Sequence, residues 1–244
     1  MASAIEMHYV GIKVSELQAF AENIYIVDGP PVRPFGVAFP TRMIIAKLAD
    51  GSLWVNSPVP VSGTVLERIR QLGIVRHLVV PTRLHVWRLE EWHALFREAA
   101  LWAPPQIPRQ FRNLPFAGGL TDEPPRVWAD DFDQLVFRGN LFIEEVYFRH
   151  KRSRTVVFGD FIQNYPLSEG RALFNALVKM ARIQYPDGGV PIDIRLSFTD
   201  RRAARQSLEK LLSWDFDKLI LAHGSCVRED AKAFVQRAFQ WLRK

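Results

Sequence analysis

Residues 77–92 read HLVVPTRLHVWRLEEW, and this stretch predicts the architecture of the chain. An apolar, β-branched run at 78–80 ends at Pro81, a short polar loop follows, and an amphipathic segment begins near Leu89. A buried strand that passes through a polar loop into a helix is the arrangement in which α/β proteins place their functional groups. We therefore expect the functional site to include this loop.

Further apolar runs on both sides of this stretch predict strands. They lie at 23–27, 43–48, 53–55, 75–80, 101–103, 134–137, 142–148, 155–158 and 218–222. The turn Asp50-Gly51 is typical of a hairpin. Amphipathic runs predict helices from Thr64 to Gly73, from Leu89, at 172–180, after Asp200 and at 231–242. Thr64 and Glu67 fit a capping box, and Asp200 fits a helix N-cap. Residues 104–130, rich in Pro, Gly and Arg, predict an irregular excursion over the surface.

Composition indicates an ordinary globular chain. The 244 residues are 48% hydrophobic, with a mean hydropathy of -0.06, and we expect a single domain over residues 1–244. The formal net charge of +6 permits anionic partners. However, the chain has no clear nucleic-acid signal, because basic and aromatic residues do not interleave in a patch. We interpret the basic run at 149–154 as a solvated hairpin turn.

The lone cysteine bears on the compartment. Cys226 cannot form an internal disulfide or a Cys-rich zinc site, which favours a reducing compartment. The N-terminal residues have no pattern of a signal peptide, and no apolar run reaches the roughly 18 residues of a membrane span. The expectation is a cytoplasmic protein without membrane contact. The sequence gives no indication of oligomeric state.

Three polar residues follow predicted strands. His85 comes after the strand at 75–80, Asp160 after 155–158, and His223 after 218–222. If these strands are neighbours, the three side chains meet at one sheet edge. Two imidazoles and a carboxylate form a sound ligand set for Zn²⁺ or Fe²⁺. The alternative is structural: histidines bonded to backbone and an aspartate that forms a turn. Spacing alone leaves both interpretations open.

Short motifs spread over nearly the whole chain add a resemblance to a known family. They are DGPP at 28–31, TRM at 41–43, LWVNSPVP at 53–60, VRHLVVP at 75–81, APP at 103–105, DEPP at 122–125 and WDFDKLILAHG at 214–224. Together they resemble a family of unknown function within the metallo-β-lactamase superfamily. The resemblance implies an α/β fold, the four-layer αββα sandwich, which many hydrolases use with one or two metals at the sheet edge.

The signature loop of that superfamily, Thr-His-x-His-x-Asp-His, is degenerate here. Laid on Thr82, it places Arg83 at the first histidine, His85 at the second, Trp87 at the aspartate and Arg88 at the last histidine. Arginine has no lone pair to donate and tryptophan cannot ligate a metal. A two-metal hydrolase is therefore not expected.

The remaining ligand positions also follow from the resemblance. A Gly-His pair of the superfamily corresponds to Gly139-Asn140, its bridging aspartate to Asp160 and its final histidine to His223. In the parent pattern His85 belongs to one metal, His223 to the other, and Asp160 bridges them. Neither parent site is complete.

Two hypotheses follow. In the first, the protein is a single-metal hydrolase of unknown small-molecule substrate: His85, Asp160 and His223 hold Zn or Fe, with Asn140 oxygen or water as a further ligand. A bound water is then the nucleophile, Asp160 takes part in catalysis, and Arg83 or Arg88 stabilises a developing oxyanion. In the second, the protein is a metal-free pseudoenzyme: Arg83 or Arg88 pairs with Asp160, and the arginine-lined pocket binds a small anion.

Overall fold

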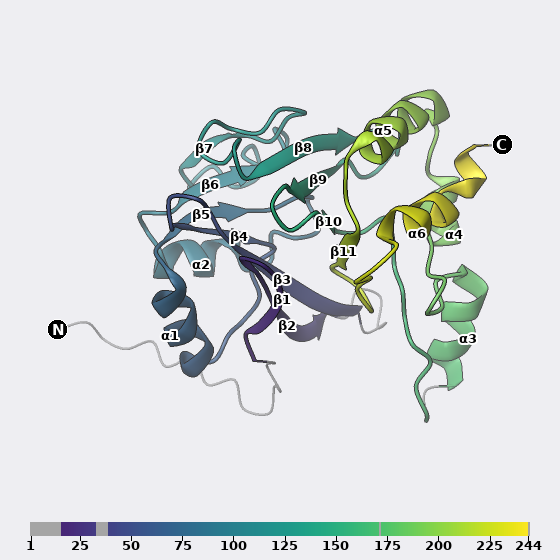
Figure 1. Ribbon diagram of the computed structural model, residues 1–244, viewed down its shortest axis with the longest axis horizontal. Coiled ribbons are helices and arrows are strands. Elements are labelled where there is room, and N and C mark those ends of the chain that lie inside the picture. The colour runs from purple at the N-terminus through teal and green to yellow at the C-terminus, as the bar shows by residue number, and fades with distance from the viewer. Residues whose placement is uncertain (1–15, 33–38, 171, 244) are drawn as a thin grey trace.

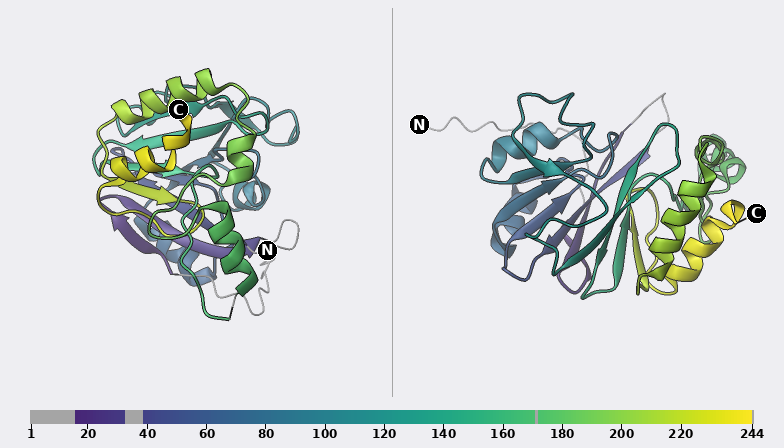
Figure 2. Two further views of the ribbon diagram at one scale, coloured as in Figure 1. Left: turned by 90° about the vertical axis from the view of Figure 1, so that its right-hand side faces the viewer. Right: turned by 90° about the horizontal axis from the view of Figure 1, so that it is seen from above.

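Two β-sheets pack face to face and helices cover their outer faces. The computed structural model describes residues 16–32, 39–170 and 172–243 (Figure 1). One sheet has seven strands in the order β1-β2-β3-β4-β5-β6-β7, and the other has four in the order β11-β10-β9-β8. Seen from above, α1 and α2 lie outside the first sheet and α3 to α6 outside the second (Figure 2). The predicted αββα sandwich is confirmed.

The seven-stranded sheet contains the strand of residues 77–92. Its members are β1 (Gln18–Ala21), β2 (Ile24–Val32), β3 (Phe39–Lys47), β4 (Leu53–Asn56), β5 (Val75–Val79), β6 (Ala100–Ala103) and β7 (Phe116–Gly119). Strands β1 to β4 pair antiparallel, and β4 to β7 pair parallel. The parallel strands β4 and β5 therefore end at the same edge of the sheet.

Strand β7 lies inside the segment predicted to be irregular, and that prediction was wrong in this part. The sequence FAGG has little β propensity, since its glycines offer no side chains to pack. The partner strand explains the glycines: a Cβ on Gly118 would lie 2.8 Å from the ring of Trp102 on β6. Glycine is needed at position 118 because the Trp102 ring occupies the space that a side chain would take.

The four-stranded sheet carries the other two candidate residues. It comprises β8 (Phe132–Phe137), β9 (Glu145–His150), β10 (Thr155–Phe158) and β11 (Lys218–Leu221). Strands β10 and β11 are parallel with Phe158 opposite Leu221, so the residues after both strands emerge side by side. The turn between β9 and β10 is confirmed at 151–154, but Arg149 and His150 of the basic run belong to β9, and His150 and Ser153 are buried rather than solvated. Arg154 of the turn pairs with Asp215.

The helices lie on the outer faces of the sheets, and buried apolar residues of α1, α2, α5 and α6 join the cores there. They are α1 (Gly63–Leu72), α2 (Leu89–Leu95), α3 (Ala172–Ala181), α4 (Ile192–Leu196), α5 (Arg201–Ser213) and α6 (Ala231–Ala238), followed by the 3-10 turn η2 (Gln240–Leu242). Asp200 caps α5 as predicted, accepting from the Ala203 amide. The capping box on Thr64 was wrong: Ser62 caps α1, accepting from the Val65 amide. Among these helices, none has the length and apolarity to cross a bilayer.

Aromatic side chains fill the space between the sheets. Trp54 on β4 is fully buried, and its ring centre lies 4.7 Å from that of Phe132 and 4.9 Å from that of Phe148, both on the opposite sheet. Aromatic pairs at these separations add to the stabilisation from burial. This packing fixes the distance between the sheets, and with it the distance between the loops at their shared edge.

Candidate metal centre

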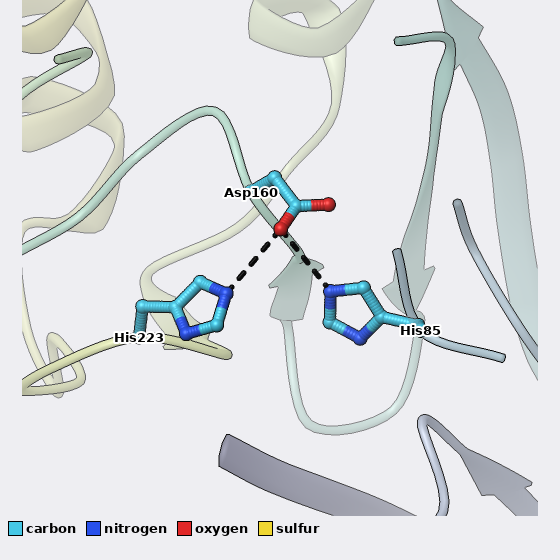
Figure 3. Close-up of side chains that lie close together, drawn as sticks. All are labelled: His85, Asp160 and His223. Carbon is cyan, nitrogen blue, oxygen red and sulfur yellow. Dashed lines mark hydrogen bonds and ion pairs between the residues drawn. The ribbon is translucent and has the colours of Figure 1, made fainter. Parts of the chain in front are cut away.

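Three side chains from three strand ends meet at one edge of the sandwich. His85 follows β5, Asp160 follows β10 and His223 follows β11. Both Nε2 atoms point at the same carboxylate oxygen, Asp160 Oδ1, and the two rings lie next to each other on one side of it (Figure 3). The distances are 3.4 Å from His85 and 3.3 Å from His223. One atom from each residue lies within 4.8 Å of the others, which is compatible with a shared metal ion.

The Asp160 carboxylate is buried and fixed on both oxygens. Thr82 Oγ1 donates to Oδ2 over 2.9 Å, which leaves Oδ1 to the histidines. Burial opposes ionisation, but the neighbouring His85 and His223 rings outweigh it and hold the pKa of Asp160 below its ordinary value. Asp160 is therefore an anion at neutral pH.

Glu145, the first residue of β9, holds the loop that carries Asp160. Its buried carboxylate accepts from the amides of Gly159, Asp160 and Phe161, the last two at 3.0 and 2.9 Å. Burial and the charge of Asp160 raise the pKa of Glu145. A Cβ on Gly159 would lie 3.1 Å from Glu145 Oε1, so glycine lets the carboxylate reach the backbone. Glu145 was not predicted from the sequence, although the pair Glu144-Glu145 inside the apolar strand predicted at 142–148 was a signal.

His223 is held from behind by backbone of the other sheet. Its Nδ1 lies 2.7 Å from the carbonyl oxygen of Pro40 on β3. Arg42, two residues further along β3, fixes the loop itself: its Nη1 donates to the carbonyls of Leu221 and Gly224 at 2.6 and 2.9 Å. The same nitrogen lies 3.0 Å from the Cys226 sulfur, and burial raises the pKa of that thiol.

His85 is held from behind by a side chain. Its Nδ1 lies 2.7 Å from Ser57 Oγ, and the Ser57 hydroxyl donates to Asn56 Oδ1 over 2.7 Å. Both residues are buried at the end of β4. They form part of the motif LWVNSPVP, but sequence reasoning gave them no role.

Comparison with known proteins identifies the family. Residues 30–170, more than half of the chain, match the family model described as "Domain of unknown function (DUF4336)". The chain belongs to this family. A search among curated proteins finds no match.

Solved structures share the fold at low sequence identity. The DIM-1 metallo-β-lactamase has a TM-score of 0.63 at 15% identity, with 95% of this chain and 99% of that chain covered. A flavoprotein from Thermotoga maritima has a TM-score of 0.65 at 10% identity, covering 95% of this chain and 62% of that one. The Flv1 flavodiiron core from Synechocystis sp. PCC6803 gives 0.65 at 10%, covering 95% and 61%. This DUF4336 protein thus has the metallo-β-lactamase fold, as its motifs implied, and spans less than two thirds of the flavodiiron chains.

At the degenerate positions of the signature loop, the side chains of this DUF4336 chain point to solvent or pair with a neighbouring residue. Arg83 is exposed, and the Trp87 side chain is 70% exposed. Arg88 donates to Glu91 Oε2 over 3.0 Å. Neither arginine is among the groups that hold the Asp160 carboxylate in place, so the predicted pairing of an arginine with Asp160 is replaced by Thr82 and the two histidines.

Asn140 is a turn residue, and the prediction that its oxygen supplements the ligands was wrong. Its Oδ1 accepts from the amides of Phe142 and Ile143 at 2.9 and 3.1 Å. Its Nδ2 donates to Ser197 Oγ over 2.7 Å. The side chain therefore ties its own loop to the end of α4, because asparagine readily bonds the backbone two and three residues on.

Proposed function

We propose that this protein binds one divalent metal ion through His85, Asp160 and His223 and is a hydrolase of a small-molecule substrate. The observation that carries the proposal is the distance of each histidine Nε2 from Asp160 Oδ1. A charge-assisted N–H···O bond is typically about 2.7–2.9 Å long. The two distances here are 3.3 and 3.4 Å. A tetrahedral metal with bonds of about 2.1 Å holds neighbouring ligand atoms about 3.4 Å apart.

The hydrogen bond of His223 supports the same conclusion. A carbonyl oxygen only accepts, so the proton of a neutral His223 ring must sit on Nδ1, facing Pro40. The Nε2 atom then turns a lone pair toward an ionised carboxylate. Two electron-rich atoms at 3.3 Å need a positive charge between them, supplied either by a second ring proton, which makes His223 a cation paired with Asp160, or by a metal ion. We assign the charge to a divalent cation, because a charge-assisted N–H···O bond is shorter than this distance and because two imidazoles with one carboxylate suit Zn²⁺ or Fe²⁺.

The residues around the centre define the chemistry that it could support. A bound divalent metal would supply Lewis acidity, polarising a substrate and lowering the pKa of water. Thr82 keeps Asp160 oriented by occupying its second oxygen. The exposed Arg83, two residues before His85, is the group we propose to attract an anionic part of the substrate.

Metal content tests the proposal directly. Protein purified from unspiked medium should contain about one Zn or Fe per chain by elemental analysis, since three protein ligands fit one ion. His85→Ala and His223→Ala should each contain less than about a tenth of that amount, because each leaves only two ligands. The matched control is His93→Ala on α2, outside the centre, which should keep the metal. Retention of metal in both ligand variants, or no uptake by wild type from added Zn²⁺ and Fe²⁺, would reject the proposal.

The metal-free alternative makes the opposite prediction. It needs an arginine-lined pocket, and Arg88 is engaged by Glu91 while Arg83 is exposed. A thermal-shift series with phosphate, small carboxylates and divalent metals separates the two. Stabilisation by anions in the presence of chelator would favour the alternative, and stabilisation by metals alone would favour the metal centre.

A further inference from the structure

A buried pair of side chains behind His85 decides which nitrogen of that ring carries a proton. Ser57 Oγ lies 2.7 Å from His85 Nδ1 and 2.7 Å from Asn56 Oδ1. A serine hydroxyl has one proton, and the amide oxygen of Asn56 can only accept. The hydroxyl proton therefore points to Asn56, and Ser57 Oγ accepts from His85 Nδ1–H. We call the hydrogen bonds from His85 through Ser57 to Asn56 the relay. The relay leaves the Nε2 atom of a neutral His85 ring without a proton, so that its lone pair faces Asp160.

The backbone at Ser57 is consistent with a special role for its side chain. Its φ is +54°, in the left-handed region that favours glycine. A serine at this angle strains the chain, yet the conformation directs its hydroxyl to His85. The Ser57 amide also donates to the carbonyl of Val79 over 2.9 Å, which joins it to the strand that leads into the His85 loop. Ser57 and His85 are thus fixed to each other by backbone and by side chain.

We propose that Ser57, backed by Asn56, is a positioning residue that fixes His85 as the tautomer whose Nε2 is free to bind a metal. This inference rests on the metal centre proposed above. Partners that accept a proton from a ligating histidine typically change metal affinity by about 10- to 100-fold when they are removed. His223 has a backbone carbonyl in this position, which substitution cannot remove. Ser57 is therefore the partner that mutagenesis can test.

Two variants remove the relay in different ways. Ser57→Gly deletes the hydroxyl but suits the left-handed backbone, so the melting temperature of the metal-free protein should stay within about 4 °C of wild type. Asn56→Leu keeps the hydroxyl but frees its proton to donate to Nδ1, which favours the other tautomer. Both should weaken Zn²⁺ binding by about 10- to 100-fold in competition with a chromophoric chelator.

A matched control exists in the same chain. Ser153, near the β9–β10 turn, is also buried, and its Oγ lies 2.8 Å from Nδ1 of His150. Ser153→Gly removes the same kind of contact from a histidine outside the metal centre. It should leave the Zn²⁺ affinity within about twofold of wild type, because no ligand tautomer changes.

The tautomer of His85 can also be measured in the metal-free protein. Nitrogen-15 NMR of metal-free wild type near neutral pH should show the His85 proton on Nδ1, and Asn56→Leu should move it toward Nε2. Wild-type affinity retained in both relay variants, or an Nε2–H tautomer in metal-free wild type, would overturn the inference. A wild type that binds no Zn²⁺ would reject the metal centre instead, and the NMR result would still decide the role of Ser57.

Discussion

His77 on β5 should make the stability of this protein depend on pH in the mildly acidic range. Its ring lies between the sheets, 5.1 Å from the ring centre of Trp128, and its Nδ1 accepts from Trp102 Nε1 over 3.3 Å. Burial lowers the pKa of His77 from 6.5 to about 4, with a smaller contribution from Arg76 against an opposing one from Asp50. The folded protein thus requires the neutral ring.

The direction and size of the effect follow from this pKa. The unfolded chain takes up a proton near pH 6.5, whereas the folded chain does so only near pH 4. The stability contributed by the neutral ring is therefore present above pH 6.5 and is lost as the pH falls from 6.5 to about 4. At about 1.4 kcal/mol per pKa unit this corresponds to about 3 kcal/mol, which partial solvent screening reduces to about 2 kcal/mol.

Guanidinium unfolding at pH 7.5 and 4.5 measures the effect, with chelator present so that metal binding does not contribute. His77→Gln keeps an acceptor for Trp102 but cannot titrate. Between the two pH values, wild type should lose about 2 kcal/mol more unfolding free energy than the variant does. Equal losses in the two proteins would refute the assignment of this pKa to His77 burial.

Three further substitutions test the surroundings of the centre. Glu145→Gln places an amide donor against the amides that Glu145 now accepts from, so unfolding free energy should fall by about 2 kcal/mol in denaturant titrations. Arg42→Lys loses the bonds to the His223 loop, and amide hydrogen exchange at 221–226 should become faster while exchange at β8 stays as in wild type. Trp54→Ala leaves a cavity between the sheets and should lower unfolding free energy by about 3–5 kcal/mol.

The sequence was informative about the three residues of the candidate site because they follow strand ends. His223 comes directly after an apolar run, Asp160 one residue and His85 a short loop further on, and parallel strands deliver such residues to one edge. Their supporting groups have no such signal. Ser57 is 28 residues from His85, and the Pro40 carbonyl is 183 residues from His223. The Pro40 carbonyl belongs to the backbone, so no residue type in the sequence indicates its role. Serine is common in turns, so Ser57 could not be recognised as a partner of His85.

Asn140 shows a different reason for failure. The superfamily pattern places it at a ligand position, and its oxygen could have served in that role. In the folded chain the nearest donors are the amides two and three residues on, which occupy the oxygen. Local hydrogen bonds of asparagine compete with any distant ligand, and pattern matching cannot register that competition.

The proposed centre is built from residues of both sheets. Metal affinity can therefore be lowered either by disturbing the packing of the sheets or by changing the tautomer of one histidine. His85 and Thr82 follow a strand of the seven-stranded sheet and contact Asp160, which follows a strand of the other sheet. His223, which follows a strand of the four-stranded sheet, donates a hydrogen bond to the Pro40 carbonyl of the seven-stranded sheet. Because these contacts span the sheets, a change in the spacing of the sheets alters the distance from His85 to Asp160 and to His223, whereas the contact between Asp160 and His223 lies within one sheet. Trp54→Ala acts on that spacing, so stability and metal affinity should fall together, whereas Ser57→Gly should lower affinity alone. That difference distinguishes loss of packing from loss of a histidine tautomer.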